Sequence, residues 1–235
     1  MRVCLASTSP ARLMLLGQFG IRPLTVAPDV DEEAVIAAVE AAEARTLAPD
    51  EHVLLLARRK AADVAARLRD DIPDFDGVVI GGDSMFEIGG DVLGKPYTPE
   101  NAAARWRAMR GRTGVLHSGH AVVRIEPGQP PREVHATAAA SVSFVADVTD
   151  AEIDAYVATG EPLHVAGAFT VDSLGGAFIE RVDGDPSTVV GMSVSTLRRL
   201  VREVGVEWTA LWNTTDPSLE RADIGEKSFV EDGAQ

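Results

Sequence analysis

Residues 2–12 read RVCLASTSPAR, and this stretch contains the pattern that sets the fold class of the whole chain. The apolar run Arg2–Ala6 predicts a short buried strand. Ser9 then stands where a helix N-cap is expected, and Pro10 suits the first helical position because its missing N–H costs nothing there. The segment therefore predicts a strand that passes directly into a helix, which continues to about Gly20.

The alternation of strands and helices continues along the chain. Apolar periodicity predicts helices at residues 51–69, 98–109, 150–158 and 193–204, and an alanine-rich helix after the acidic residues 29–33. Apolar runs predict strands at 24–27, 77–82, 118–125, 133–144 and 178–182, and a hairpin formed by 85–88 and 91–93. Such alternation implies a mixed α/β fold, with strand directions left open. The domain is expected to span residues 1–212, followed by a polar, flexible tail at 213–235.

Composition excludes several classes of protein. The chain has 235 residues, 46% of them hydrophobic, and a net charge of −14, which argues against binding to nucleic-acid polymers. No apolar segment approaches the roughly 20 residues that cross a bilayer, and polar residues interrupt any signal-peptide core near the N-terminus. A cytoplasmic, reduced setting is therefore expected, in which the single Cys4 is a buried thiol.

Common catalytic motifs are missing from the sequence. It contains no GxxxxGK[ST] phosphate loop, no HExxH zinc helix, no GxSxG nucleophile elbow and no GxGxxG dinucleotide fingerprint. His117 and His120 are three residues apart on a predicted strand, so we expect them to face opposite sides of the sheet and to form no zinc site.

The serine-rich loop before the first helix is one candidate for a phosphate site. The hydroxyls of Ser7 and Ser9 and the free N–H groups of a helix N-terminus can bind phosphate, and Arg12 lies in the first helical turn. A plainly capped helix is the alternative, and the segment alone favours it because a strand followed by a cap and a helix is a common arrangement.

Asp83 follows the glycine pair Gly81-Gly82 at the expected end of a buried strand. Glycine lets the backbone pass close to a ligand, and the carboxylate could hold a metal or take a proton from water. An aspartate that only forms a turn is the alternative.

Two lysines complete the local candidates. Lys95, between Gly94 and Pro96, has a restricted backbone that suits a phosphate contact, although this motif alone favours a solvated loop lysine. The helical pattern predicts that Lys60 faces solvent beside Arg58 and Arg59. The acids near Glu32 complement a helix N-terminus.

In their order along the chain, these segments resemble the Maf family. The matching motifs are LASTSPAR (5–12), ARRKA (57–61), IGGDSM (80–85), LGKP (93–96), YVATGEPLHVAG (156–167) and VDGDPSTVVG (182–191). The match covers about residues 2–206.

The resemblance implies an α/β fold of the Maf/ITPase type, with two lobes around a mixed, strongly bent sheet and a nucleotide cleft between them. It also implies a homodimer that uses a divalent metal (Mg, Mn or Co) to hydrolyse nucleoside triphosphates to monophosphates and pyrophosphate. The implied roles are a general base for Asp83, metal binding for Glu32 and Asp83, a phosphate loop for Ser7 and Ser9, and phosphate contacts for Arg12, Lys60 and Lys95.

The sequence departs from the family pattern at two positions. Ala11 stands where many members carry a first arginine, and Asp172 stands where many carry a glutamine that faces the base or the metal. The sequences of residues 162–167 and 185–187 are closer to the family branch that acts on 7-methyl-GTP than to the branch that acts on dTTP and UTP. The departures also leave open a nucleotide-binding regulator of septum formation with little catalysis.

Overall fold

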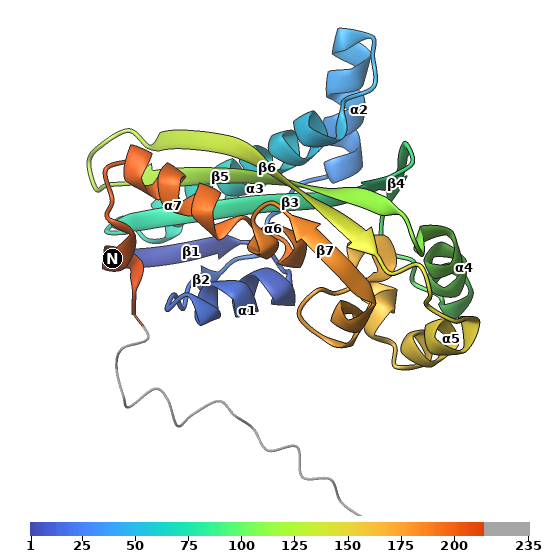
Figure 1. The fold of residues 1–235 in the computed structure, drawn as a ribbon. Coiled ribbons are helices and arrows are strands. Elements are labelled where there is room, and N and C mark those ends of the chain that lie inside the picture. The colour runs from blue at the N-terminus through green and yellow to red at the C-terminus, as the bar shows by residue number, and fades with distance from the viewer. Residues whose placement is uncertain (214–235) are drawn as a thin grey trace, which may run out of the picture.

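The computed structural model describes residues 1–213, which form a mixed sheet with helices on both faces (Figure 1). The strands are β1 (Arg2–Ala6), β2 (Leu24–Thr25), β3 (Gly77–Ile88), β4 (Asp91–Leu93), β5 (Thr113–Ile125), β6 (Arg132–Phe144) and β7 (Ile179–Asp183). The predicted tail lies outside the described residues, apart from Asn213.

Helices fill most of the connections between strands. The α-helices are α1 (Pro10–Gln18), α2 (Glu32–Glu43), α3 (Pro49–Asp71), α4 (Pro99–Met109), α5 (Asp150–Ala158), α6 (Pro186–Val190) and α7 (Val194–Glu203). Short 3₁₀ helices are η1 (Glu161–His164), η2 (Ala166–Ala168), η3 (Leu174–Phe178) and η4 (Trp208–Leu211). Among residues 1–213, no helix combines the length and the apolar character needed to cross a membrane.

The sheet has the strand order β2-β1-β3-β5-β6-β7, with β4 paired to part of β3. Strand β1 runs parallel to β2 and β3, whereas the pairs β3–β5, β5–β6 and β6–β7 are antiparallel. This arrangement confirms the predicted mixed α/β fold class and supplies the strand directions.

The predicted strand at residues 77–82 is longer than expected, and Asp83 is not at its end. β3 pairs with β5 without interruption from Gly77 to Glu87, so Asp83 lies in the middle of the strand, opposite Gly119. Gly81 and Gly82 do not end β3. Gly81 instead allows close packing, since a Cβ at this position would come within 2.2 Å of the Ala57 carbonyl on α3. Close approach of helix and strand, rather than a turn, therefore explains this glycine.

Local signals at the start of α1 agree with the structure. Ser9 has an extended backbone and its side chain accepts the Arg12 N–H, while Pro10 occupies the first turn. The predicted N-cap is therefore confirmed, and the chain enters α1 directly after β1. Cys4 is a fully buried free thiol, as expected.

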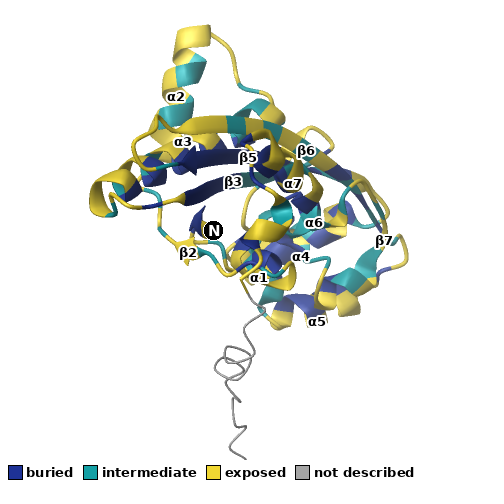
Figure 2. Cartoon of the chain, turned by 90° about the vertical axis from the view of Figure 1, so that its left-hand side faces the viewer, coloured by how far each residue is buried: buried dark blue, intermediate teal, exposed yellow. Residues whose placement is uncertain are grey.

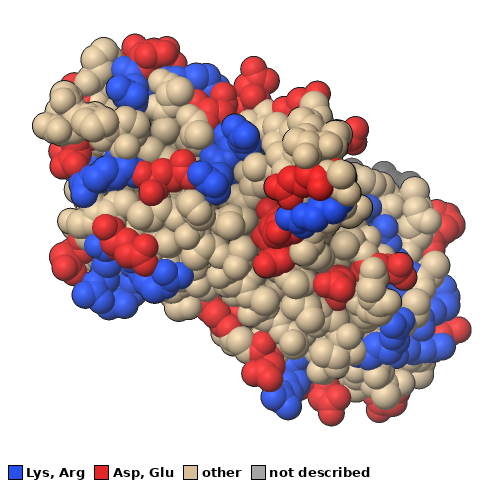
Figure 3. Space-filling view, turned by 90° about the horizontal axis from the view of Figure 1, so that it is seen from above, with Lys and Arg blue, Asp and Glu red and all other residues tan. Residues whose placement is uncertain are grey.

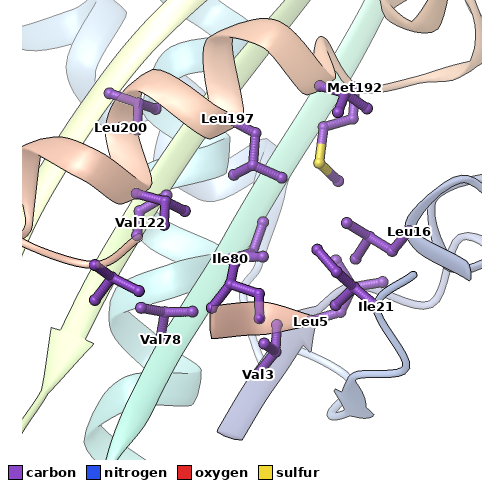
Figure 4. Packing of buried hydrophobic residues seen from close by; sticks show 14 of the residues in the cluster. Val3, Leu5, Leu16, Ile21, Val78, Ile80, Val122, Met192, Leu197 and Leu200 are labelled. Atoms are coloured by element: carbon purple, nitrogen blue, oxygen red, sulfur yellow. The ribbon is translucent and has the colours of Figure 1, made fainter. Parts of the chain in front are cut away.

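Three apolar clusters stabilise the sheet. One packs α1 and α7 onto one face (Figure 4), and a second packs the small residues of α3 onto the other face. The third, rich in aromatic residues, joins the far end of β3, β5 and β6 to α4 and α5. Helix α2 has no buried residue and projects from the body of the molecule (Figures 1 and 2).

The two strand histidines lie on opposite faces of β5, as predicted. His120 is fully buried and its Nε2 accepts the Ser193 N–H at 2.8 Å, on the side of α7. The Nε2 of His117 instead lies 3.1 Å from a carboxylate oxygen of Glu87.

Candidate active site

A cavity of about 650 Å³ brings together every residue that the sequence predicted for the site. These residues are Ser7, Ser9, Arg12, Glu32, Lys60, Asp83, Lys95 and Asp172. The cavity also borders two of the apolar clusters, through Val190 on one side and Leu116 and Phe169 on the other. Residues far apart in sequence therefore share one site.

Lys60 lines this cavity and contacts two of its carboxylates. Its Nζ is 2.7 Å from Asp83 Oδ1 and 2.8 Å from Glu32 Oε1, and the residue is only 6% exposed. The prediction that Lys60 faces solvent is wrong, because Lys60 follows the buried Leu56 and Ala57 at helical spacing and shares their face of α3. Its burial is compensated by the two carboxylates.

Glu32 and Asp83 reach this lysine from different elements. Asp83 projects from β3 with a side chain 15% exposed, whereas Glu32 begins α2 and its side chain is 50% exposed. Because both carboxylates contact the same ammonium, a single cationic centre already lies between them. Carboxylate oxygens suit hard divalent cations, so this pair could also hold a metal ion.

A metal at this position would need further ligands. The described residues contain no group of three or more His, Cys, Asp or Glu side chains able to hold a metal ion. Mg²⁺ sites commonly use one or two carboxylates and complete the shell with water and substrate phosphates. The carboxylate pair therefore fits an ion that arrives with a polyphosphate.

Arg12 is tied to three protein acceptors. Its Nε donates to the Gly191 carbonyl at 2.9 Å, and its Nη atoms donate to the hydroxyls of Ser84 at 3.0 Å and Ser7 at 3.3 Å. Burial lowers the pKa of this guanidinium, and the nearby carboxylates of Asp83 and Glu32 oppose that shift. A guanidinium has five N–H groups, and these bonds use three of them.

The loop before α1 is both a helix cap and part of the cavity wall. The Ser7 hydroxyl accepts the Ser9 N–H at 3.1 Å, and the Ser9 hydroxyl accepts the Arg12 N–H at 3.4 Å. The N-terminus of α1 faces the cavity through residues 8–11, where the helix dipole favours an anion. The two interpretations that the sequence left open are therefore compatible.

The segment after β7 fixes Arg12 from the opposite side. The Gly191 carbonyl accepts hydrogen bonds from Arg12, from the Ser84 hydroxyl at 3.0 Å and from the Ser118 hydroxyl at 3.4 Å. Asp185 caps α6 a few residues earlier. The carboxylate of Asp185 accepts five hydrogen bonds, from the N–H and hydroxyl of Ser187, the hydroxyl of Ser193 and the N–H and hydroxyl of Ser195.

The other wall of the cavity is mostly apolar. Phe169 contacts Phe86 and Phe144, with ring centroids 4.9 and 5.0 Å apart. Beside it, residues 164–166 and 170–172 line the cavity and end in the exposed carboxylate of Asp172. Lys95 is an exposed residue at the rim. An apolar surface that ends in an acid suits an aromatic base better than a phosphate.

Both signs of charge occur on the surface and in the cavity. Figure 3 shows acidic and basic side chains interspersed over the face seen from above. Inside the cavity, the cations Arg12 and Lys60 lie close to the carboxylates of Asp83 and Glu32. The cavity therefore contains both cations and carboxylates.

Sequence reasoning missed several residues of the site. Ser84 and Gly191 line the cavity, and Asp185 organises the segment around Gly191. All three lie inside motifs that the sequence singled out, so the motifs were the available signal. The roles were not visible because they arise from contacts between distant segments.

Comparisons with known proteins identify the family of the chain. The family profile described as Maf-like protein matches residues 2–204. The chain belongs to the Maf family. It is 61% identical over 219 residues to a protein of Leifsonia xyli subsp. xyli named nucleoside triphosphate pyrophosphatase, covering 93% of this chain and 100% of that protein. A protein of the same name from Rhodococcus jostii is 50% identical over 209 residues, covering 88% of this chain and 94% of that protein.

A solved structure of the Staphylococcus aureus Ham1 protein shows only weak similarity. It covers 62% of this chain and 73% of its own, with a TM-score of 0.30 and 10% identity, and adds nothing to the assignment.

Proposed function

We propose that this Maf-family protein is a nucleoside triphosphate pyrophosphohydrolase that releases a monophosphate and pyrophosphate. The observation that carries the proposal is the convergence of Asp83, Glu32 and Lys60 in the same cavity as the N-terminus of α1 and Arg12. Relatives at 61% and 50% identity bear the name of this activity, which supports it.

Binding of the triphosphate follows from the charges of the polar wall. Arg12, Lys60 and Lys95 provide positive charge, and the backbone N–H groups at the start of α1 are oriented for an anion. A divalent cation held by Glu32 and Asp83 would screen the phosphate oxygens and lower the pKa of a bound water.

Asp83 acts as the general base in this proposal. Its backbone is held in the middle of β3 and its carboxylate is ion-paired with Lys60, and it accepts a proton from the water that attacks the α–β phosphate linkage. Lys60 offsets the repulsion between Asp83 and Glu32. Arg12 and Lys95 stabilise the charge that moves onto the leaving pyrophosphate.

The apolar wall is the proposed site of the base. Phe169 and its neighbours provide an apolar surface, and the Asp172 carboxylate can accept two N–H groups, as a guanine presents through N1 and its 2-amino group. An acid also favours a cationic base over a neutral one, which supports 7-methyl-GTP as a substrate.

A panel of unmodified and N7-methylated triphosphates tests the proposal, with Mg or Mn present and with pyrophosphate and orthophosphate measured separately. We expect metal-dependent pyrophosphate, a monophosphate, and faster turnover of the methylated guanine nucleotide. Orthophosphate as the only product would overturn the proposed cleavage site. Tight binding of triphosphate without turnover would favour the nucleotide-binding regulator.

A further inference from the structure

The carboxylate of Glu161 lies outside the lining of the cavity but is bonded to the segment that forms its apolar wall. Oε1 accepts hydrogen bonds from the Tyr156 hydroxyl at 3.0 Å and the Gly175 N–H at 3.1 Å, and also from the Thr170 hydroxyl. Oε2 accepts from the Ser173 hydroxyl at 2.7 Å and the Leu174 N–H at 3.3 Å. A single side chain thus accepts five hydrogen bonds.

Four of the five donors belong to residues 170–175, which include the wall residues Thr170, Val171 and Asp172. Asp172 lies between Thr170 and Ser173, whose hydroxyls are both held by Glu161. The path of the backbone on either side of Asp172 is therefore fixed by one carboxylate.

The fifth donor connects this segment to the aromatic core. Tyr156 on α5 is 4% exposed, and its ring packs against Trp106 with centroids 5.3 Å apart. A Cβ on Gly175 would come within 2.5 Å of the Tyr156 hydroxyl, so the segment passes very close to it. The wall is consequently held against a rigid part of the molecule.

The charge of Glu161 matters for this arrangement. Burial raises the pKa of Glu161, but the bonds from Thr170, Ser173, Gly175 and Tyr156 outweigh burial and bring it down to about 2. An ionised carboxylate only accepts hydrogen bonds, whereas an amide of the same shape must point an NH₂ group at some of these donors.

We propose that Glu161 is a positioning residue that sets the discrimination between bases by fixing residues 170–175. The inference rests on the proposed function, since it assigns the base to the wall that Glu161 holds. Glu161 touches neither Asp83 nor Lys60 through any hydrogen bond or ion pair of the described residues, so the phosphate chemistry is expected to be insensitive to it.

The test is Glu161→Gln, assayed for kcat and KM with two triphosphates that differ only in the base. Dissociation constants for the matching α,β-methylene analogues and the Tm are measured alongside. We expect KM for the preferred base to rise roughly 10-fold, the effect of one lost charge-assisted hydrogen bond, with kcat changed less than about 2-fold. The preference between the two bases is expected to shrink.

Glu203→Gln serves as the matched control, because Glu203 pairs with Arg199 on α7 and does not line the cavity. Tyr156→Phe removes one hydrogen-bond donor to Glu161 and should shift KM in the same direction by a smaller factor. This variant replaces Glu161→Gln in the test if Glu161→Gln does not fold.

Several outcomes would overturn the inference. A base preference that stays unchanged in Glu161→Gln and Tyr156→Phe would contradict it. An equal rise in KM for both triphosphates, together with a lower Tm, would also contradict it, because it would indicate a general loss of stability. A wild-type protein that hydrolyses neither triphosphate would overturn the proposed function. The dissociation constants of the α,β-methylene analogues would still test the role of Glu161, because they require no turnover.

Discussion

The two walls of the cavity are held in place by different forces. On the polar wall, Lys60 forms ion pairs with Asp83 and Glu32, and Arg12 donates hydrogen bonds to the Gly191 carbonyl and the Ser84 hydroxyl. On the apolar wall, Phe169 is packed in an aromatic cluster and residues 170–175 depend on Glu161. The difference predicts that the proposed phosphate chemistry and the proposed base selection can be altered separately.

A different carboxylate supports each wall of the cavity. Asp185 and Glu161 each accept five hydrogen bonds and line neither wall themselves. Asp185 holds the segment of Gly191, and thereby Arg12, whereas Glu161 holds the segment of Asp172. Two carboxylates with similar hydrogen bonding thus hold two different walls of the cavity.

The largest effect is expected for Asp83→Asn. Loss of the general base should reduce kcat roughly a thousandfold, because an amide cannot take the proton from water. The analogue dissociation constants should change far less, since Arg12 and the N-terminus of α1 remain. Near-normal turnover in this variant would show that Asp83 does not have the assigned role.

Asp185→Asn is expected to have the next largest effect. Displacement of the Gly191 carbonyl would misplace Arg12 and lower kcat by roughly 10–100-fold. The loss of charge-assisted bonds should also lower the free energy of unfolding by about 2 kcal/mol, measured in urea. Asp183→Asn, at an exposed position two residues earlier, is the control; equal losses in both variants would contradict the assigned role of Asp185.

Acid should destabilise the protein in two ranges of pH. Burial lowers the pKa of His120 to about 4. Between about pH 6.5 and 4 the imidazole is therefore protonated in the unfolded state but not in the folded state, so the free energy of unfolding falls as the pH drops through this range.

Glu161 and Asp185 act at lower pH. Burial raises the pKa of both, but their hydrogen bonds bring it down to about 2, so their contribution is present above about pH 5 and lost as the pH falls towards 2. Urea titrations of Glu161→Gln should therefore match the wild-type slope above pH 5 and be flatter below it. Parallel curves at all pH values would exclude this contribution.

Much of the fold could be predicted from local signals. The N-cap at Ser9 and the helix at 150–158 were predicted correctly because caps and periodicity are properties of short segments. The continuous strand β3 was missed because Gly81 looks like a turn residue until α3 is seen packed against it. Lys60 was misplaced because two exposed arginines precede it, and its buried partners come from other elements.

The site was predicted as a set of residues, but its arrangement was not. The eight residues predicted for the site line one cavity, and their functional roles remain predictions. The bonds of Gly191, Asp185 and Glu161 join segments whose proximity depends on the sheet order, which the sequence left open. The division into two lobes, the homodimer and the cytoplasmic setting remain predictions.

The division of labour between the walls is tested most directly by the ratio of kcat/KM for 7-methyl-GTP and dTTP in Lys60→Met and Asp172→Asn. Lys60→Met should lower both values by a similar factor and leave the ratio unchanged, since its ammonium contacts only the polar wall. Asp172→Asn should reduce the ratio roughly 10-fold by removing a carboxylate that accepts N–H groups of the base. A ratio that changes in Lys60→Met, or stays constant in Asp172→Asn, would contradict the account.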